Sequence, residues 1–176
     1  MQLSLKSTYS STLKTTAWVL PIAIALPILV HLAPPFNGIP MGAYLLPMFY
    51  MPIVVLIAYR LPVALIVAAL APPINFILSG NPHWVLMGIL TFELVIFTLL
   101  TYVFLLQGII KWIAAPLAYL GSKTISSTVL IFIPLIDASP VQFFSTSISN
   151  AVVGIVILFV INVLCLKYLP HQRKDA

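Results

Sequence analysis

Charged residues and cysteine are what this sequence has least of. Only 6% of its 176 residues are charged, with eight Lys or Arg and three Asp or Glu. Because a soluble domain carries about 25% charged residues, the soluble and disordered classes are excluded. The single cysteine, Cys165, lies in an apolar run, so the chain forms no internal disulfide and is no secreted disulfide scaffold.

Catalytic motifs are absent as well. The sequence contains no H-E-x-x-H, G-x-S-x-G, Walker or G-x-G-x-x-G pattern. Only one carboxylate, Glu93, falls deep inside an apolar run. Hydrolysis, phosphoryl transfer and two-carboxylate chemistry need groups that this chain lacks. We therefore expect no enzyme, no metal site and no cofactor, and a binding or transport role.

Apolar length is what the sequence has in abundance, since 62% of its residues are hydrophobic. A helix crosses a bilayer with about 20 apolar residues. The chain is therefore predicted to be all-α: one polytopic integral membrane domain, residues 1–176, built as a bundle of six transmembrane helices. The predicted spans are 17–33, 43–59, 61–78, 84–106, 111–136 and 148–166.

The basic residues predict the orientation, because basic loops resist translocation. With a cytoplasmic N-terminus, the outer loops 34–42, 79–83 and 137–147 contain no Lys or Arg. Seven basic residues then face the cytoplasm: Lys6, Lys14, Arg60, Lys111, Lys167, Arg173 and Lys174. Both termini are thus expected in the cytoplasm, with the protein in the cell (plasma) membrane. The net charge of +5 follows this topology and does not indicate nucleic-acid binding.

Prolines are frequent inside the predicted spans. Each one removes a backbone donor and bends its helix, which a membrane tolerates where protein or a cavity satisfies the freed carbonyl. Together they favour a bent, cavity-forming bundle. The prolines concerned are Pro21, Pro27, Pro47, Pro52, Pro72, Pro116 and Pro134.

Two charges are predicted to lie at the same depth. Glu93 lies about nine residues into the predicted span 84–106, which at 1.5 Å per residue places it about 13 Å below the outer surface. Lys123 lies twelve residues beyond Lys111, which places it about 12 Å below that surface in a core of about 30 Å. Charges in hydrocarbon pair or face a wet cavity. The two residues therefore form a structural ion pair, reach a polar ligand, or do both.

Further polar and aromatic side chains gather on the outer side, where the proline-stiffened loop 34–42 is a candidate lid. Histidine and tryptophan at this level also serve as plain interfacial anchors, and that alternative stays open. The candidate ligand-binding residues are His31, Asn37, Asn75, Asn81, His83, Trp84, Glu93, Lys123 and Asn150.

Two stretches of the chain resemble a known family. Residues 46–53 (LPMFYMPI) resemble a second-helix pattern L-P-M-x-x-P-V, shifted by one residue. Residues 71–82 (APPINFILSGNP) resemble S-P-L-L-S-x-L-L-T-G-M-P, and Glu93-Leu94 follows. Gly121-Ser122-Lys123 stands where relatives have Gly-Arg. With this match densest over residues 31–95, the chain resembles the substrate-binding (S) components of energy-coupling factor (ECF) transporters.

The resemblance implies a function. S components capture vitamins or cofactors from outside and associate with a transmembrane coupling subunit and two ATPase subunits; they topple in the membrane to release the ligand. Their first-helix motif A-x-x-x-A, which docks on the coupling subunit, corresponds to Ala17, Pro21 and Ala25 here, so the motif is not intact.

Three other interpretations remain. The chain could be a stand-alone secondary carrier or channel with Glu93 as a relay. It could be an integral-membrane enzyme or haem protein with His31 and His83 as outer-face ligands, or a purely structural membrane subunit.

Overall fold

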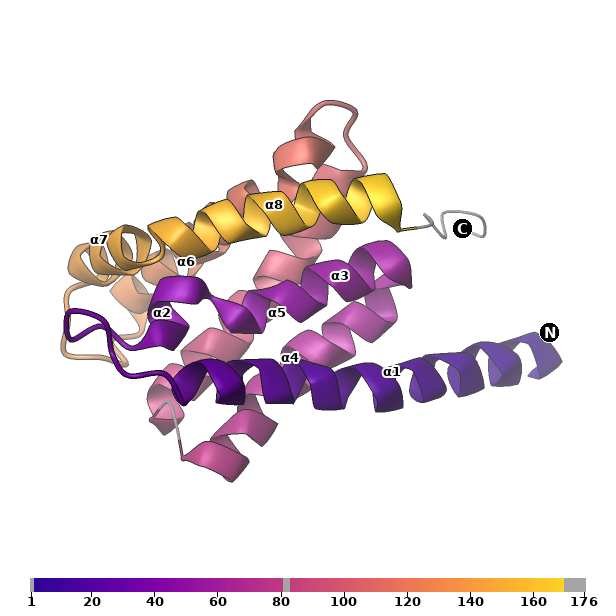
Figure 1. Ribbon diagram of the computed structural model, residues 1–176, viewed down its shortest axis with the longest axis horizontal. Helices are drawn as coiled ribbons and strands as arrows, with labels where there is room; N and C mark the ends of the chain where they lie inside the picture. The colour runs from indigo at the N-terminus through magenta and orange to yellow at the C-terminus, as the bar shows by residue number, and fades with distance from the viewer. Residues whose placement is uncertain (1, 81–82, 170–176) are drawn as a thin grey trace.

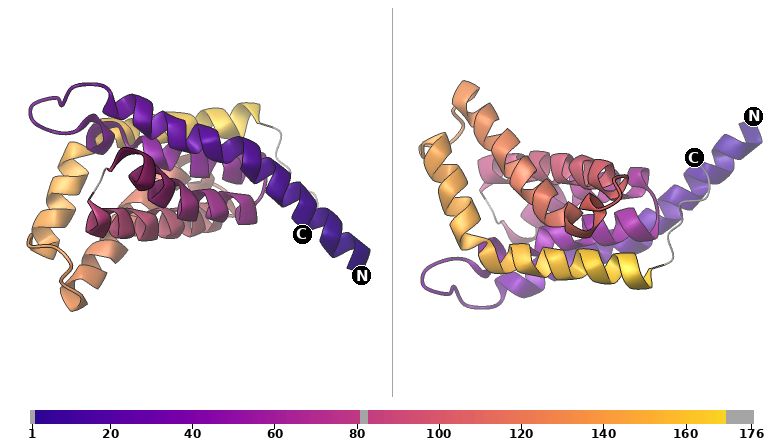
Figure 2. Two further views of the ribbon diagram at one scale, coloured as in Figure 1. Left: turned by 90° about the horizontal axis from the view of Figure 1, so that it is seen from below. Right: turned by 90° about the horizontal axis from the view of Figure 1, so that it is seen from above.

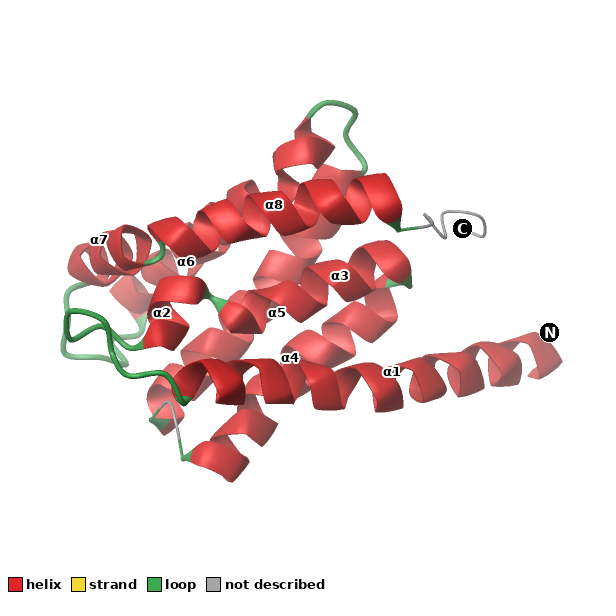
Figure 3. Ribbon diagram, in the orientation of Figure 1, coloured by secondary structure: helices red, strands yellow, loops and turns green. Residues whose placement is uncertain are grey.

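The computed structural model describes residues 2–80 and 83–169, and this part of the chain is made of helices without a strand (Figures 1 and 3). The long helices are α1 (Gln2–His31), α4 (Leu61–Ser79), α5 (Trp84–Leu105), α6 (Ala114–Phe132) and α8 (Val152–Tyr168). The short ones are α2 (Met41–Leu45), η1 (Pro47–Phe49), α3 (Tyr50–Ala58), η2 (Ile110–Ile113) and α7 (Pro140–Asn150). The predicted all-α class is confirmed.

Several of these helices are long and apolar enough to cross a bilayer. In the described part of the chain they are Thr12–His31 of α1, Leu61–Ser79 and Trp84–Leu105. The pair α7 and α8, bent by 62° at their junction, adds a fourth if it counts as one span. The protein is therefore a membrane protein with three to four helices of spanning length among its described residues.

The predicted span 43–59 is broken into α2, η1 and α3. Leu46 adopts a left-handed conformation, with φ 58° and ψ 42°, and the following Pro47 has no backbone N–H to continue the helix. The Tyr50 hydroxyl donates a hydrogen bond to the Leu45 carbonyl near the break. Gly154 of α8 lies against the same point, where a Cβ would come within 2.6 Å of Leu46 Cγ. The predicted span 43–59 is therefore not one continuous helix in the structure.

The other difference lies in the predicted outer loop 137–147, most of which is helix α7. Ser139 caps this helix, since its hydroxyl accepts a hydrogen bond from the Gln142 N–H at 3.2 Å, and Pro140 takes the first helical position. As a result, α6 ends at Phe132 and α8 begins at Val152, inside the predicted limits of 111–136 and 148–166.

The helices run back and forth between two ends of the bundle (Figure 1). The start of α1 and the end of α8 lie at one end. The loop between α1 and α2, the start of α5 and helix α7 lie at the other. Figure 2 shows α7 and the end of α6 standing away from the remaining helices, joined to α8 through the bend at Ala151.

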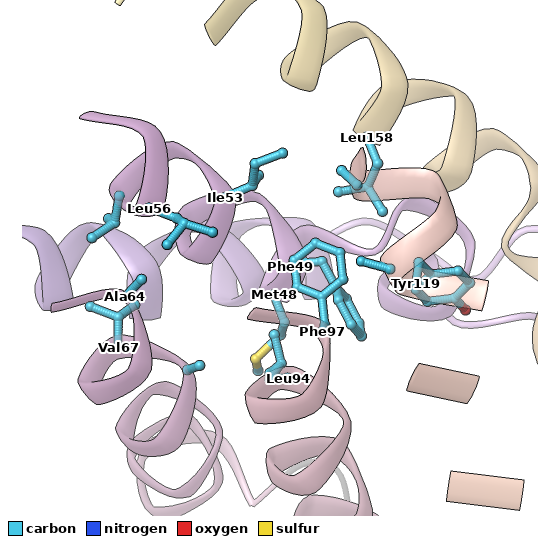
Figure 4. Packing of buried hydrophobic residues seen from close by; sticks show 14 of the residues in the cluster. Met48, Phe49, Ile53, Leu56, Ala64, Val67, Leu94, Phe97, Tyr119 and Leu158 are labelled. Carbon is cyan, nitrogen blue, oxygen red and sulfur yellow. The ribbon is translucent and has the colours of Figure 1, made fainter. Parts of the chain in front are cut away.

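The core lies in the middle of the bundle, where aromatic rings from three elements meet (Figure 4). Phe49 contacts Phe97 and Tyr119 edge-on, with ring centroids 5.1 Å apart in each pair. Leu94 and Leu158 are fully buried beside them. This packing fixes η1, α5 and α6 relative to one another, and these elements carry the candidate site.

Candidate functional site

A cavity of about 750 Å³ opens at the end of the bundle that holds α7. Its walls come from the end of α1, the loop to α2, the α2–η1 break, and helices α5, α6 and α7. The lining residues are His31, Ala33, Pro35, Pro40, Met41, Gly42, Ala43, Leu46, Pro47, Met48, Phe49, Leu86, Ile89, Leu90, Glu93, Tyr119, Lys123, Ala138, Gln142, Phe143, Thr146, Ser147 and Asn150.

Two helices each present one face to this cavity. On α5, residues 86, 89, 90 and 93 follow the spacing of a single helical face: three apolar side chains and then Glu93. On α7, residues 142, 143, 146, 147 and 150 do the same, and four of these five are polar. The cavity thus has an apolar wall on α5 and a largely polar wall on α7.

Glu93 and Lys123 form an ion pair at the cavity. Lys123 Nζ lies 2.9 Å from Glu93 Oε1 and 2.7 Å from Oε2, so the ammonium donates to both carboxylate oxygens. The side chains of Glu93 and Lys123 are 1% and 10% exposed, respectively. Because both charges are buried, each needs the other, and the matching depth predicted from the sequence corresponds to an actual contact.

Neighbouring groups complete the surroundings of the pair. The Ser126 hydroxyl lies 2.7 Å from Glu93 Oε1, to which it donates, and 3.1 Å from the Lys123 carbonyl. The Lys123 ammonium lies 4.9 Å from the ring centroid of Phe143 and 6.0 Å from that of Tyr119. Each carboxylate oxygen therefore has a donor, and the ammonium has aromatic faces on its remaining side.

Four of the nine predicted site residues line the cavity: His31, Glu93, Lys123 and Asn150. His31 Nδ1 lies 2.7 Å from the Pro27 carbonyl in the last turn of α1, which orients the ring. The ring packs on Gly42, where a Cβ would come within 2.8 Å of His31 Nε2. Gly42 thereby lets the end of α1 approach α2 closely.

The other predicted site residues do not line it. Asn37 lies in an exposed turn with φ 50°. Asn75 is buried in α4, and its side-chain amide donates to the Ile24 carbonyl of α1 at 3.3 Å, so it joins two helices. The rings of His83 and Trp84, at the start of α5, are tilted by 48° with centroids 5.9 Å apart, and Trp84 is 62% exposed. Asn81 lies outside the described residues.

The proposed haem ligands are therefore not both in the cavity, since His31 lines it and His83 does not. Among the described residues, no group of three or more His, Cys, Asp or Glu is placed to hold a metal ion.

The expected docking residues lie on one exposed face of α1. Ala17, Pro21 and Ala25 follow one another at intervals of four residues, and all three are exposed. The buried face of α1 carries Val19 and Ala23 instead.

Sequence reasoning named Asn150 of α7 but missed Ser126, Phe143 and the fact that residues 140–150 form a helix. A signal for α7 was present: Ser139 and Pro140 form a helix start, and polar residues recur at 142, 146 and 150. Ser126 gives no such signal, because its role depends on its position one turn from Lys123 and opposite Glu93.

No protein-family model, curated protein or solved structure matches this chain.

Proposed function

We propose that this chain is the membrane-embedded, high-affinity small-molecule binding subunit of an ATP-driven, ECF-type uptake transporter. It spans the plasma membrane six times with both termini in the cytoplasm, and it takes a vitamin- or cofactor-like ligand from outside. The observation that supports this most is the cavity, which lies at the end of the bundle away from the start of α1 and the end of α8 and contains a buried ion pair.

The size and lining of the cavity agree with this role. Small-molecule sites measure about 300–1,000 Å³ and combine apolar walls with a few polar groups. Here the apolar wall comes from α5 and the α2–η1 break, and the polar groups come from α7 and His31. Nothing in this set resembles a nucleophile with its base, so the proposed role is binding without covalent chemistry.

Energy for uptake would come from partners, a transmembrane coupling subunit and two ATPase subunits. The exposed face of α1 with Ala17, Pro21 and Ala25 is the proposed docking surface. The small side chains of Ala17 and Ala25 permit close approach of another membrane helix.

Gentle purification from native membranes tests this proposal. We expect native mass spectrometry to find a carried small molecule, and ATPase subunits to co-purify. Leu86→Trp, which fills the cavity, should lose the small molecule. Leu99→Trp, a lipid-facing change on the same helix, should keep it.

Other outcomes separate the alternatives. A carried ligand without ATPase subunits would favour a stand-alone carrier, and a Soret band would favour a haem protein. A chain that is always empty and always part of a larger assembly would favour a structural subunit.

A further inference from the structure

We propose that the ligand of this cavity carries no net charge, and that its polar edge faces α7 while its apolar body lies on α5. This inference rests on the proposed function and specifies the chemical class of the ligand.

The first argument is the charge balance of the cavity. Among the described residues that line it, the only Asp, Glu, Lys or Arg are Glu93 and Lys123, and they neutralise each other through two short contacts. Asp137 lies nearby in the loop before α7 but is exposed and does not line the cavity. A charged ligand would find no free counter-charge.

The second argument is that the two charges of the ion pair are already engaged with each other. Glu93 Oε1 accepts from both Lys123 and Ser126, and Oε2 accepts from Lys123. The side of the ammonium that is not bonded to Glu93 faces aromatic rings, with Phe143 at 4.9 Å. A ligand carboxylate would have to displace Phe143 or compete with Glu93, and either change would leave a buried charge less well paired.

The third argument is the row of neutral polar groups on α7. Gln142, Thr146 and Asn150 lie one helical turn apart, and Ser147 lies beside them, all facing the cavity. Amides and hydroxyls both donate and accept hydrogen bonds. Such a row fits amide, imide, ureido or hydroxyl groups at the edge of an uncharged molecule.

Among the α5 residues that line the cavity, Glu93 is the only polar one. Leu86, Ile89 and Leu90 of α5 form an apolar strip, and Met48 and Phe49 continue it at the core end of the cavity. The cavity thus fits a molecule with one polar edge and one apolar face.

The experiment compares pairs of compounds that differ in one charged group. The pairs are panthenol with pantothenate, biotin amide with biotin, and pyridoxine with pyridoxamine. Affinities of the full-length protein in detergent are measured by isothermal titration calorimetry at about pH 7.5, where each charged member is ionised. We expect the tightest binder to be uncharged and to bind at least about ten-fold more tightly than its charged partner, because the charged group loses its hydration without gaining a counter-charge.

Variants of α7 test the second half of the proposal. Gln142→Leu and Asn150→Leu should each weaken binding of that uncharged compound about ten-fold, since each leaves a polar group of the ligand unpaired. Ser145→Ala and Ser149→Ala change hydroxyls of the same helix that do not line the cavity and should leave the affinity unchanged.

The outcomes are distinct. A charged compound that binds as tightly as its uncharged partner overturns this inference and leaves the proposed function standing. Equal loss of affinity in the α7 variants and their controls overturns the assignment of the polar edge. Absence of binding by all six compounds, with no carried molecule in native mass spectrometry, overturns the inference and the proposed function together.

Discussion

At the scale of single residues, the buried Glu93–Lys123 ion pair tolerates substitution of one partner poorly. Two charges have been removed from water, and their attraction offsets that cost only while both are present. Because the Ser126 hydroxyl bonds to the same carboxylate, the geometry is held from two directions. Breaking the pair by removing one member should therefore cost more than removing both.

We predict that Glu93→Gln and Lys123→Met each destabilise the protein by about 3–5 kcal/mol, because each strands the opposite charge. The double variant should recover most of this loss. Thermal unfolding in detergent, followed by intrinsic fluorescence, measures the three changes. If the double variant is no more stable than the less stable of the two single variants, a stranded buried charge does not explain their loss of stability.

At the scale of elements, the break between α2 and η1 shapes one wall of the cavity and depends on α8. Leu46 in its left-handed conformation lies against Gly154, which is 108 residues later in the chain. A Cβ at this glycine would come within 2.9 Å of the Leu45 carbonyl carbon and 2.6 Å of Leu46 Cγ. Backbone cannot rotate away as a flexible side chain can, so α8 would have to move.

Gly154→Ala should therefore destabilise the protein by about 1–3 kcal/mol, the usual cost of overpacking. It should also reduce ligand capture, since Leu46 and Pro47 line the cavity. Gly88→Ala is the matched control: it lies within helix α5, and a Cβ there meets nothing within 4 Å. Denaturation midpoints of the two variants give the comparison. Equal stability of both would mean that α8 adjusts without strain.

The same elements show how far sequence reasoning reaches. The predicted span 61–78 matches α4, and 84–106 matches α5 to within one residue, because long apolar runs end at clear signals such as Gly80, which is left-handed with φ 70°. The position of the break at Leu46 could not be predicted from the sequence. Pro47 alone is also compatible with a kinked helix, and Gly154, which packs against Leu46, is distant in the sequence.

The sequence predicted the depth of the site residues along their helices, but not the direction in which their side chains point. Counting residues along two spans brought Glu93 and Lys123 to one level, and they do meet. The same count placed Asn75, His83 and Trp84 near the outer side without showing which way each side chain points around its helix. Asn75 turns to α1 and Trp84 turns outward, whereas Asn150 faces the cavity.

At the scale of the whole molecule, the two ends of the bundle differ in chemistry. Helix α7 lies at one end, while the end of α3, η2 and the end of α8 lie at the other (Figures 1 and 2). Arg60 follows α3, Lys111 is part of η2, and Lys167 is in the last turn of α8. Two of these cations lie over neighbouring rings, Lys111 at 5.6 Å from Trp112 and Lys167 at 5.2 Å from Tyr168. Aromatic and basic residues together are typical of a membrane–water interface, and the basic ones favour the cytoplasmic face.

Six spans with both termini in the cytoplasm would place the cavity outside and the basic end inside. Labelling with a membrane-impermeant maleimide in intact cells tests this arrangement, after Cys165→Ala removes the only native thiol. Asn37→Cys and His83→Cys, both at exposed positions beside the cavity end, should be labelled. Gln172→Cys should react only after the cells are permeabilised, because the adjacent basic residues in the sequence favour the cytoplasmic side. Labelling of residue 172 in intact cells would contradict a cytoplasmic C-terminus. Protection of residue 37 would place the cavity end of the bundle on the cytoplasmic side, which is the wrong side for uptake.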